Sequence, residues 1–146
     1  MPKIWLDMDG TLADLYGVED WLPKLLSHDE TPYAEAKPVV NMNVLARLLN
    51  KIQRNGYKVC IVTALAGGST AEYDEKVINV KKRWLRTHLK SVQFDEIRFV
   101  SYTAVKNEVN EGNDYLFDDE ERHLKNWTGT AIHASEMIQT LKALVA

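Results

Sequence analysis

Two aspartates stand two positions apart near the start of the chain, in the segment DMDGT at residues 7–11. The apolar run at residues 4–6 comes directly before them, and a glycine stop after such a run favours a buried strand. Alternation along a strand sends Asp7 and Asp9 in similar directions. Paired carboxylates at one point serve as nucleophile, as general acid or base, or as oxygen ligands of a hard cation such as Mg²⁺.

Three further features add polar side chains, two of them at the ends of predicted strands. They are Thr63 in the apolar segment 58–64, Lys106, and the acid pair Asp118 and Asp119 after the apolar run 115–117. Taken singly each is ordinary, since most lysines are solvated and acidic residues are common before helices. Their combination is informative, because α/β proteins bind ligands at the carboxyl ends of their strands.

In this order the four features resemble the motifs of the haloacid-dehalogenase-like (HAD) phosphohydrolases: an early DxDGT, an apolar strand ending in Thr or Ser, a Lys and a late DD. The resemblance implies that Asp7 forms an aspartyl-phosphate and that Asp9 acts as general acid and then as base. It also implies that Thr63 and the backbone N–H groups that follow, beginning at Ala64, hold the phosphoryl oxygens. Lys106 would supply positive charge there.

The same carboxylates predict a magnesium site. Several carboxylates around one point require a hard cation. Water molecules and a substrate phosphate would complete its coordination shell. By resemblance, the ligands are the Asp7 carboxylate, the Asp9 backbone carbonyl and one acid of the late pair. We expect Asp119 to bind the ion directly and Asp118 to stand beside it.

Strands alternate with helical patterns along the chain, which predicts a doubly wound, Rossmann-like parallel sheet of about five strands with helices on both faces. Asn41 and a Ser69 to Glu72 capping box are expected to begin two of the helices. The predicted helices cover 41–55, 69–89, 120–127 and 135–145, and further strands cover 97–100 and 131–134. We expect residues 1–146 to form a single HAD-like domain.

Residues 14–38 interrupt the alternation. This segment, called the insertion below, carries Trp21, Tyr33 and Pro32, and is expected to form short helices rather than a strand. The resemblance implies that an insertion at this point is a cap over the site that selects the substrate. Its length is too small for the full helical cap of larger relatives, so we expect a fairly open site.

Within the superfamily, three segments are similar to the 5'(3')-deoxyribonucleotidases: DMDGTLAD (7–14), KKRWLRTHL (81–89) and DYLFDD (114–119). The similarity implies that Lys81, three residues before Trp84, lies near the phosphate; a solvated helix face is the alternative for this lysine. The chain differs from these relatives at Ala64, where they commonly have Ser, and in the length of the cap.

The expected substrate is a small phosphorylated molecule, a nucleoside monophosphate by this similarity. Trp21 or Tyr33 would then stack on the base, or else both rings anchor the insertion to the core. Another small phosphometabolite such as a sugar phosphate, or a catalytically silent HAD-like scaffold, remains an alternative. A phosphoacceptor signalling domain does not fit. In such domains the adjacent acidic pair comes early and a separate aspartate takes the phosphate later, whereas here the adjacent pair is the late one.

Composition places the chain among ordinary globular enzymes, with 146 residues, 45% hydrophobic and 27% charged. A formal net charge of −3 argues against nucleic-acid polymers and anionic membranes as partners. The single Cys60 is expected to be a small buried residue. Without a recognisable leader or an apolar stretch of about 18 residues, the expected location is the cytoplasm.

Overall fold

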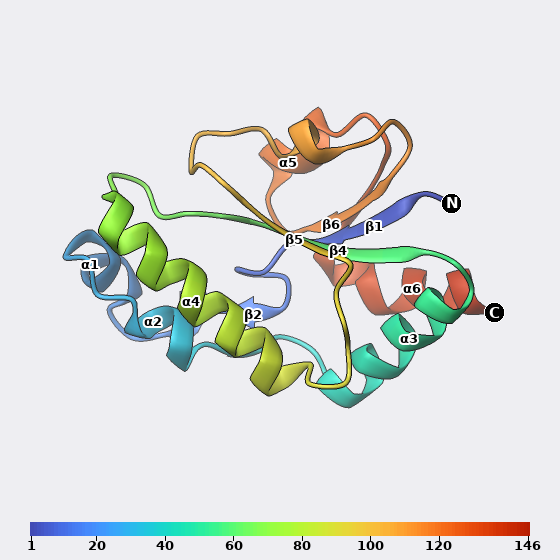
Figure 1. The fold of residues 1–146 in the computed structure, drawn as a ribbon, viewed down its shortest axis with the longest axis horizontal. Helices are drawn as coiled ribbons and strands as arrows, with labels where there is room; N and C mark the ends of the chain where they lie inside the picture. Colours follow the sequence, from blue (N-terminus) through green and yellow to red (C-terminus); the bar gives the residue numbers. More distant parts are fainter.

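The central sheet has five parallel strands. They are β1 (Lys3–Leu6), β4 (Lys58–Ala64), β5 (Glu96–Val100), β6 (Tyr115–Asp118) and β7 (Thr130–His133). Their spatial order is β5-β4-β1-β6-β7 (Figure 1). The computed structural model describes all residues from 1 to 146. The predicted α/β class and five-stranded parallel sheet are confirmed.

Helices cover the two faces of the sheet unequally. The longer helices α3 (Met42–Arg54), α4 (Ala71–His88) and α6 (Met137–Val145) pack on one face. The short α5 (Glu121–Asn126) and the 3₁₀ turn η2 (Lys106–Val109) lie over the other (Figure 1). None of the helices is both long enough and apolar enough to cross a membrane.

Strand β1 sits in the middle of the sheet and sends side chains into both cores. Ile4 and Leu6 join the cluster under α3, α4 and α6, whereas Trp5 points to the opposite face. Cys60 lies in that second cluster and is fully buried, as expected. The alternation of β1 therefore fixes which way the residues after Leu6 can point.

The N-terminal cap of α3 is the predicted residue, whereas that of α4 differs from the prediction by one position. The side chain of Asn41 accepts a hydrogen bond from the Val44 N–H and caps α3 as predicted. Helix α4 is capped by Thr70, whose Oγ1 accepts from the Tyr73 N–H at 3.2 Å, so the predicted Ser69 capping box is wrong. Neighbouring hydroxyl residues can both cap, and the helix begins one residue later than that box requires.

The insertion is helical in its interior and paired at its ends. Strands β2 (Ala13–Asp14) and β3 (Lys37–Pro38) form an antiparallel pair. Between them lie the 3₁₀ turn η1 (Leu15–Gly17), α1 (Trp21–Leu26) and α2 (Thr31–Glu35). The expectation of helices alone was therefore incomplete, because the two ends satisfy each other's backbone groups.

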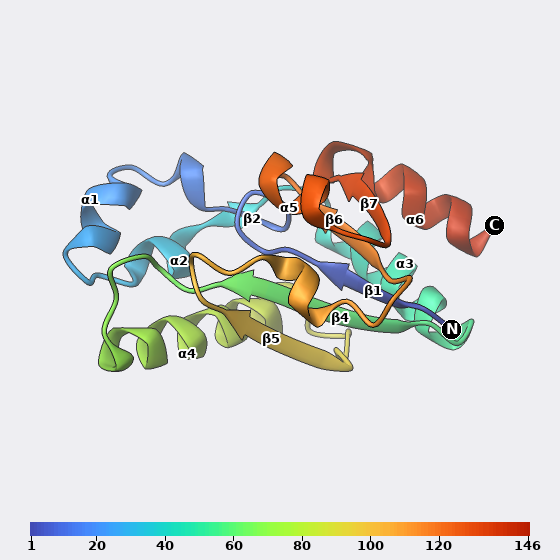
Figure 2. The same cartoon turned by 90° about the horizontal axis from the view of Figure 1, so that it is seen from above.

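Helix α4 anchors the insertion, which lies beyond the carboxyl ends of the strands (Figure 2). The Trp84 indole N–H donates to the Ala36 carbonyl at 2.8 Å, and the Tyr73 hydroxyl donates to the Asp29 carbonyl at 3.0 Å. Trp84 is buried in the core. The insertion is thus fixed next to the edge of the sheet where the predicted site residues lie.

Asp114 ties the start of β1 to the loop before β6. Its carboxylate accepts from the Lys3 N–H at 2.9 Å, the Trp5 indole at 3.1 Å and the Glu111 N–H at 3.0 Å. Burial acts to raise the pKa of this carboxyl, but these three donors lower it below its ordinary value. The role of Asp114 in the DYLFDD segment is therefore to hold the sheet together.

Replacing Asp114 with Asn is expected to reduce the free energy of unfolding at pH 7 by about 1–3 kcal/mol. The amide NH₂ of asparagine would take the place of a carboxylate oxygen and could not accept the hydrogen bond made there. A lowered pKa stabilises the fold above the unfolded value of about 3.9 and ceases to do so as the pH falls through the folded value. Urea unfolding of both proteins should thus show a difference that shrinks below about pH 4. A difference independent of pH, or one matched by the exposed control Glu19→Gln, would contradict this role.

Candidate active site

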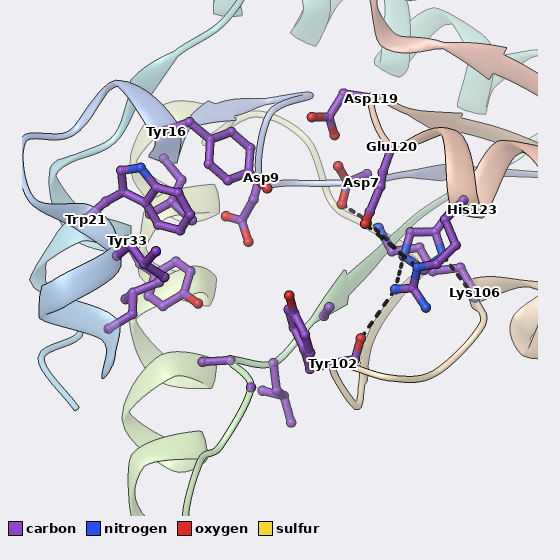
Figure 3. Close-up of a pocket in the computed structure, with 18 of the residues that line it drawn as sticks. Asp7, Asp9, Tyr16, Trp21, Tyr33, Tyr102, Lys106, Asp119, Glu120 and His123 are labelled. Carbon is purple, nitrogen blue, oxygen red and sulfur yellow. Dashed lines mark hydrogen bonds and ion pairs between the residues drawn. The ribbon is translucent and has the colours of Figure 1, made fainter. Parts of the chain in front are cut away.

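The carboxyl ends of β1, β4 and β6 lie side by side and bring the predicted site residues together. Leu6 pairs in register with Ile61 on one side and Phe117 on the other. Asp7 follows β1, Thr63 lies near the end of β4, and Asp118 ends β6. Figure 3 shows Asp7, Asp9, Asp119 and Lys106 around the same cavity.

Asp7, Asp118 and Asp119 form the centre of the site. One oxygen from each lies within 4.8 Å of the others. Gly10 makes room for this cluster: its φ is +86°, and a Cβ there would lie 2.1 Å from Asp119 Oδ2. The Thr11 hydroxyl donates to Asp7 Oδ2 at 2.9 Å. Sequence reasoning gave Thr11 no role of its own, although it is part of the DMDGT segment.

Lys106 stands between two of these acids. Its ammonium lies 2.5 Å from Asp7 Oδ1 and 2.8 Å from Asp118 Oδ2, and the side chain is 2% exposed. The other Asp118 oxygen accepts from the Glu120 N–H at 3.0 Å. Both oxygens of Asp118 are thus engaged, whereas Asp119 has only a 3.5 Å contact with the Thr11 hydroxyl. Asp119 is the acid of the late pair with oxygens left to bind a ligand.

The three acids differ in their electrostatics. Burial would raise the pKa of Asp7, but Lys106 and the hydrogen bond from Thr11 hold it below its ordinary value. Burial and the charge of Asp7 raise the pKa of Asp118 to about 6 and that of Asp119 to about 8. Negative charge at Asp119 is therefore costly in the protein alone. All the candidate ligand atoms are oxygens, and the carboxylates outnumber the positively charged groups beside them. Such a site fits a divalent cation such as Mg²⁺.

We expect Gly10→Ala to weaken Mg²⁺ binding by about 10–100-fold, the order seen when the surroundings of metal ligands are disturbed. The added Cβ would displace the Asp119 carboxylate. Isothermal titration with Mg²⁺ measures the change. Gly112→Ala is a matched control, because Gly112 has a φ of +117° and no atom within 4 Å of the added Cβ. Equal Mg²⁺ affinities in the two variants would contradict the placement of the metal site beside Asp119.

Lys81 is bonded entirely within the protein. Its ammonium donates to Asp9 Oδ2 at 2.9 Å, Thr63 Oγ1 at 2.7 Å and the Ala64 carbonyl at 2.9 Å. The side chain is 1% exposed, so the alternative of a solvated helix face is wrong. Burial raises the pKa of the Asp9 carboxyl, and the charge of Lys81 opposes that rise.

Thr63 does not reach the cavity surface. It is fully buried, and its hydroxyl oxygen accepts the hydrogen bond from Lys81. Ala64 does line the cavity, as do Ala66 and Gly67 in the loop after β4. A direct contact between Thr63 and a phosphoryl group, as the resemblance implies, would require Lys81 or the backbone to move.

The cavity, of about 330 Å³, lies between the acids and the insertion. The insertion contributes its apolar wall, formed by Leu15, Tyr16, Trp21, Leu22, Leu25, Leu26 and Tyr33. Tyr102, from the loop after β5, lies on another side (Figure 3). The cavity is therefore acidic at one end and largely aromatic and aliphatic at the other.

The aromatic rings differ in how accessible they are. Tyr33 is only 5% exposed, and the Lys81 ammonium lies 4.7 Å from its ring centre. Trp21 is half-buried, with its ring edge-on to that of Tyr16 at 4.9 Å. Tyr16 and Tyr102 are 51% and 62% exposed. The sequence left open whether Trp21 and Tyr33 stack on a ligand or anchor the insertion. It did not point to Tyr102, for which the position shortly after a predicted strand was the one available signal.

His123 is a second residue that the sequence did not reveal. It is buried, and burial together with the charge of Lys106 lowers its pKa to about 4. The neutral ring accepts the Lys106 backbone N–H at Nδ1, 3.4 Å away. Its Nε2 lies 3.2 Å from Glu120 Oε2 and can donate to it. His123 thus helps to fix the turn that carries Lys106.

Comparison with known proteins gives a similarity of fold. No family model and no curated protein sequence matches the chain. Among solved structures, a D,D-heptose 1,7-bisphosphate phosphatase from Burkholderia thailandensis is similar with a TM-score of 0.51 and 16% identity. The match covers 99% of this chain and 74% of that one. At this identity the match shows a similar fold alone.

Proposed function

We propose that the chain is a Mg²⁺-dependent phosphomonoester hydrolase with Asp7 as nucleophile. One observation carries the proposal: Asp7 is held ionised by Lys106 at 2.5 Å while Asp119, 4.8 Å away or less, offers free oxygens beside the same cavity. A buried ionised carboxylate aimed at a cavity next to a cation site fits attack on a phosphate ester. The fold of the similar phosphatase is consistent with it.

The metal would be held by the Asp7 carboxylate, the Asp9 backbone carbonyl and Asp119, with Asp118 orienting Lys106. When bound, Mg²⁺ supplies the positive charge that offsets repulsion between the carboxylate and the phosphate. Lys106 adds a fixed positive charge from the protein itself. The backbone N–H groups of Ala66 and Gly67 donate to no protein atom and are available for phosphoryl oxygens.

Two steps complete the reaction. Asp7 forms a bond to phosphorus as the ester P–O bond breaks, and Asp9 gives its proton to the leaving oxygen. Water then attacks the phosphorus of the aspartyl-phosphate, Asp9 accepts a proton from that water, and the bond between Asp7 and phosphorus breaks. Inorganic phosphate leaves, and both aspartates return to their starting state. Burial raises the pKa of the Asp9 carboxyl, which is the direction that suits a general acid.

The insertion acts as a cap in this account, and its aromatic wall selects the substrate. We infer that nucleoside monophosphates are preferred, because Tyr16, Trp21 and Tyr102 can offer ring faces to a flat base at the mouth of the cavity. A sugar phosphate is the competing class, and the similar solved structure is that of a D,D-heptose 1,7-bisphosphate phosphatase. Aromatic walls also bind sugars, so kinetics must separate the two classes.

Tyr102→Leu is expected to raise KM for a nucleoside monophosphate by about 5–150-fold, corresponding to about 1–3 kcal/mol of base stacking. KM for a sugar phosphate should change little, since leucine preserves apolar contact but lacks a ring face. Tyr33→Leu should lower the melting temperature instead, because that ring is buried under Lys81. The control is Tyr57→Leu, just before the start of β4, where its ring packs edge-on against that of Tyr115. Equal KM changes for both substrates would contradict base stacking at Tyr102.

A substrate screen tests the proposed function itself. Nucleoside monophosphates, sugar phosphates and p-nitrophenyl phosphate are each incubated with the protein, with and without Mg²⁺, and inorganic phosphate is measured. We expect hydrolysis that requires Mg²⁺, with nucleotides ahead of sugar phosphates. Binding of nucleotides without hydrolysis of any ester would favour the silent scaffold instead.

A further inference from the structure

Lys81 occupies the centre of a contact network behind the site. It lies on α4, 72 residues from Asp9 in the sequence, yet its ammonium is 2.9 Å from Asp9 Oδ2. An ammonium has three hydrogens to donate, and Lys81 has three protein acceptors, in Asp9, Thr63 and Ala64. No donor is left for a ligand, and the side chain does not line the cavity.

Lys81 fixes the Asp9 carboxylate from the side away from the cavity. Asp9 itself lines the cavity, whereas its Oδ2 is held by Lys81. The other oxygen, Oδ1, accepts no hydrogen bond from the protein and remains to carry the proton toward a leaving oxygen. Because proton transfer needs a heavy-atom approach of about 2.6–3.2 Å, the fixed carboxylate angle matters for catalysis.

The same ammonium joins the insertion to the general acid. It lies 4.7 Å from the centre of the Tyr33 ring on α2, a cation–π contact with a buried ring. Helix α2 packs along α4. One buried side chain therefore connects the loop after β1, the end of β4 and the insertion.

We propose that Lys81 is a positioning residue that holds Asp9 for proton transfer and makes no contact with the phosphoryl group. The inference rests on the proposed function and differs from the role near the phosphate that the nucleotidase similarity implies. Loss of a positioning residue slows the release of an alcohol whose oxygen needs a proton, whereas loss of a phosphate ligand slows alcohol release from every ester and weakens the binding of inorganic phosphate.

Lys81→Met tests this difference with two esters and one inhibitor. We expect the release of the first equivalent of alcohol, measured by rapid quench, to slow by about 10²-fold for an alkyl phosphate, the order of a general acid's contribution, and much less for p-nitrophenyl phosphate. The inhibition constant of inorganic phosphate should stay unchanged. Lys82→Met is the matched control, because Lys82 is the next residue on α4 and is exposed. It should alter none of the three values.

A double variant guards against misfolding, since Lys81→Met leaves a buried Asp9 without its partner. Asp9→Asn combined with Lys81→Met has no lone buried charge, and its kcat for each ester should equal that of Asp9→Asn alone. A further loss in the double variant, or equal losses for both esters with weaker phosphate inhibition, would overturn the positioning role. Absence of hydrolysis by the wild-type protein would instead overturn the proposed function, and this inference with it.

Discussion

Asp7→Asn is expected to lower kcat for Mg²⁺-dependent hydrolysis of p-nitrophenyl phosphate by about 10⁴-fold or more, the order of loss when an enzyme's nucleophile is removed. Asparagine has nearly the same shape as aspartate, but its amide cannot form the covalent phosphoryl intermediate. It also leaves the Lys106 ammonium with Asp118 as its one carboxylate partner. Initial rates under saturating ester and Mg²⁺ measure the effect.

The control for Asp7→Asn is Glu121→Gln, an exposed acid at the start of α5 that does not line the cavity. It should leave kcat unchanged. Melting curves of both variants show whether the fold survives. Full activity in Asp7→Asn, or activity that persists after exhaustive removal of divalent cations by a chelator, would contradict the assignment of Asp7.

Asp9→Asn should separate esters by their leaving groups. We expect a loss in kcat of about 10²–10⁴-fold for alkyl phosphates, whose leaving oxygen needs a proton. Loss of p-nitrophenolate from the ester should be far less affected in the first turnover, because that oxygen leaves without one. The measurement is the release of the first equivalent of each alcohol by rapid quench. Equal losses for both esters would show that Asp9 has a structural role only.

The sequence was sufficient to predict the five-stranded sheet and the polar residues at the ends of β1, β4 and β6. Asp7 and Asp118 each follow a short apolar run, and the glycine stop after Asp9 favoured a strand over a helix for the first of them. Parallel pairing of β1 with β6 brings the ends of both strands to one edge. The preference for Asp119 over Asp118 as metal ligand rested on resemblance. The engagement of both Asp118 oxygens supports it, and it stays a proposal.

Contacts between segments that are distant in the chain could not be predicted from the sequence. Lys81 meets Asp9 across 72 residues, and the helical pattern of α4 does not reveal which carboxylate the lysine faces. The burial of Thr63 has the same origin, because it depends on Lys81 lying above its hydroxyl. Tyr102 contributes to the cavity only through the loop after β5, whose path no local pattern determines.

The most direct test of the central claim is trapping of the phosphoryl group on Asp7. The Asp9→Asn variant with Mg²⁺ and p-nitrophenyl phosphate should accumulate the aspartyl-phosphate, because the base for its hydrolysis is missing. Acid quenching followed by borohydride reduction converts an aspartyl-phosphate to homoserine, which mass spectrometry locates in the N-terminal peptide. We predict homoserine at position 7, formed only when ester and Mg²⁺ are both present. The double variant that carries both Asp9→Asn and Asp7→Asn should form none. A variant that releases one equivalent of nitrophenolate per site and yet keeps an unmodified Asp7, or carries homoserine at another aspartate, would contradict the account.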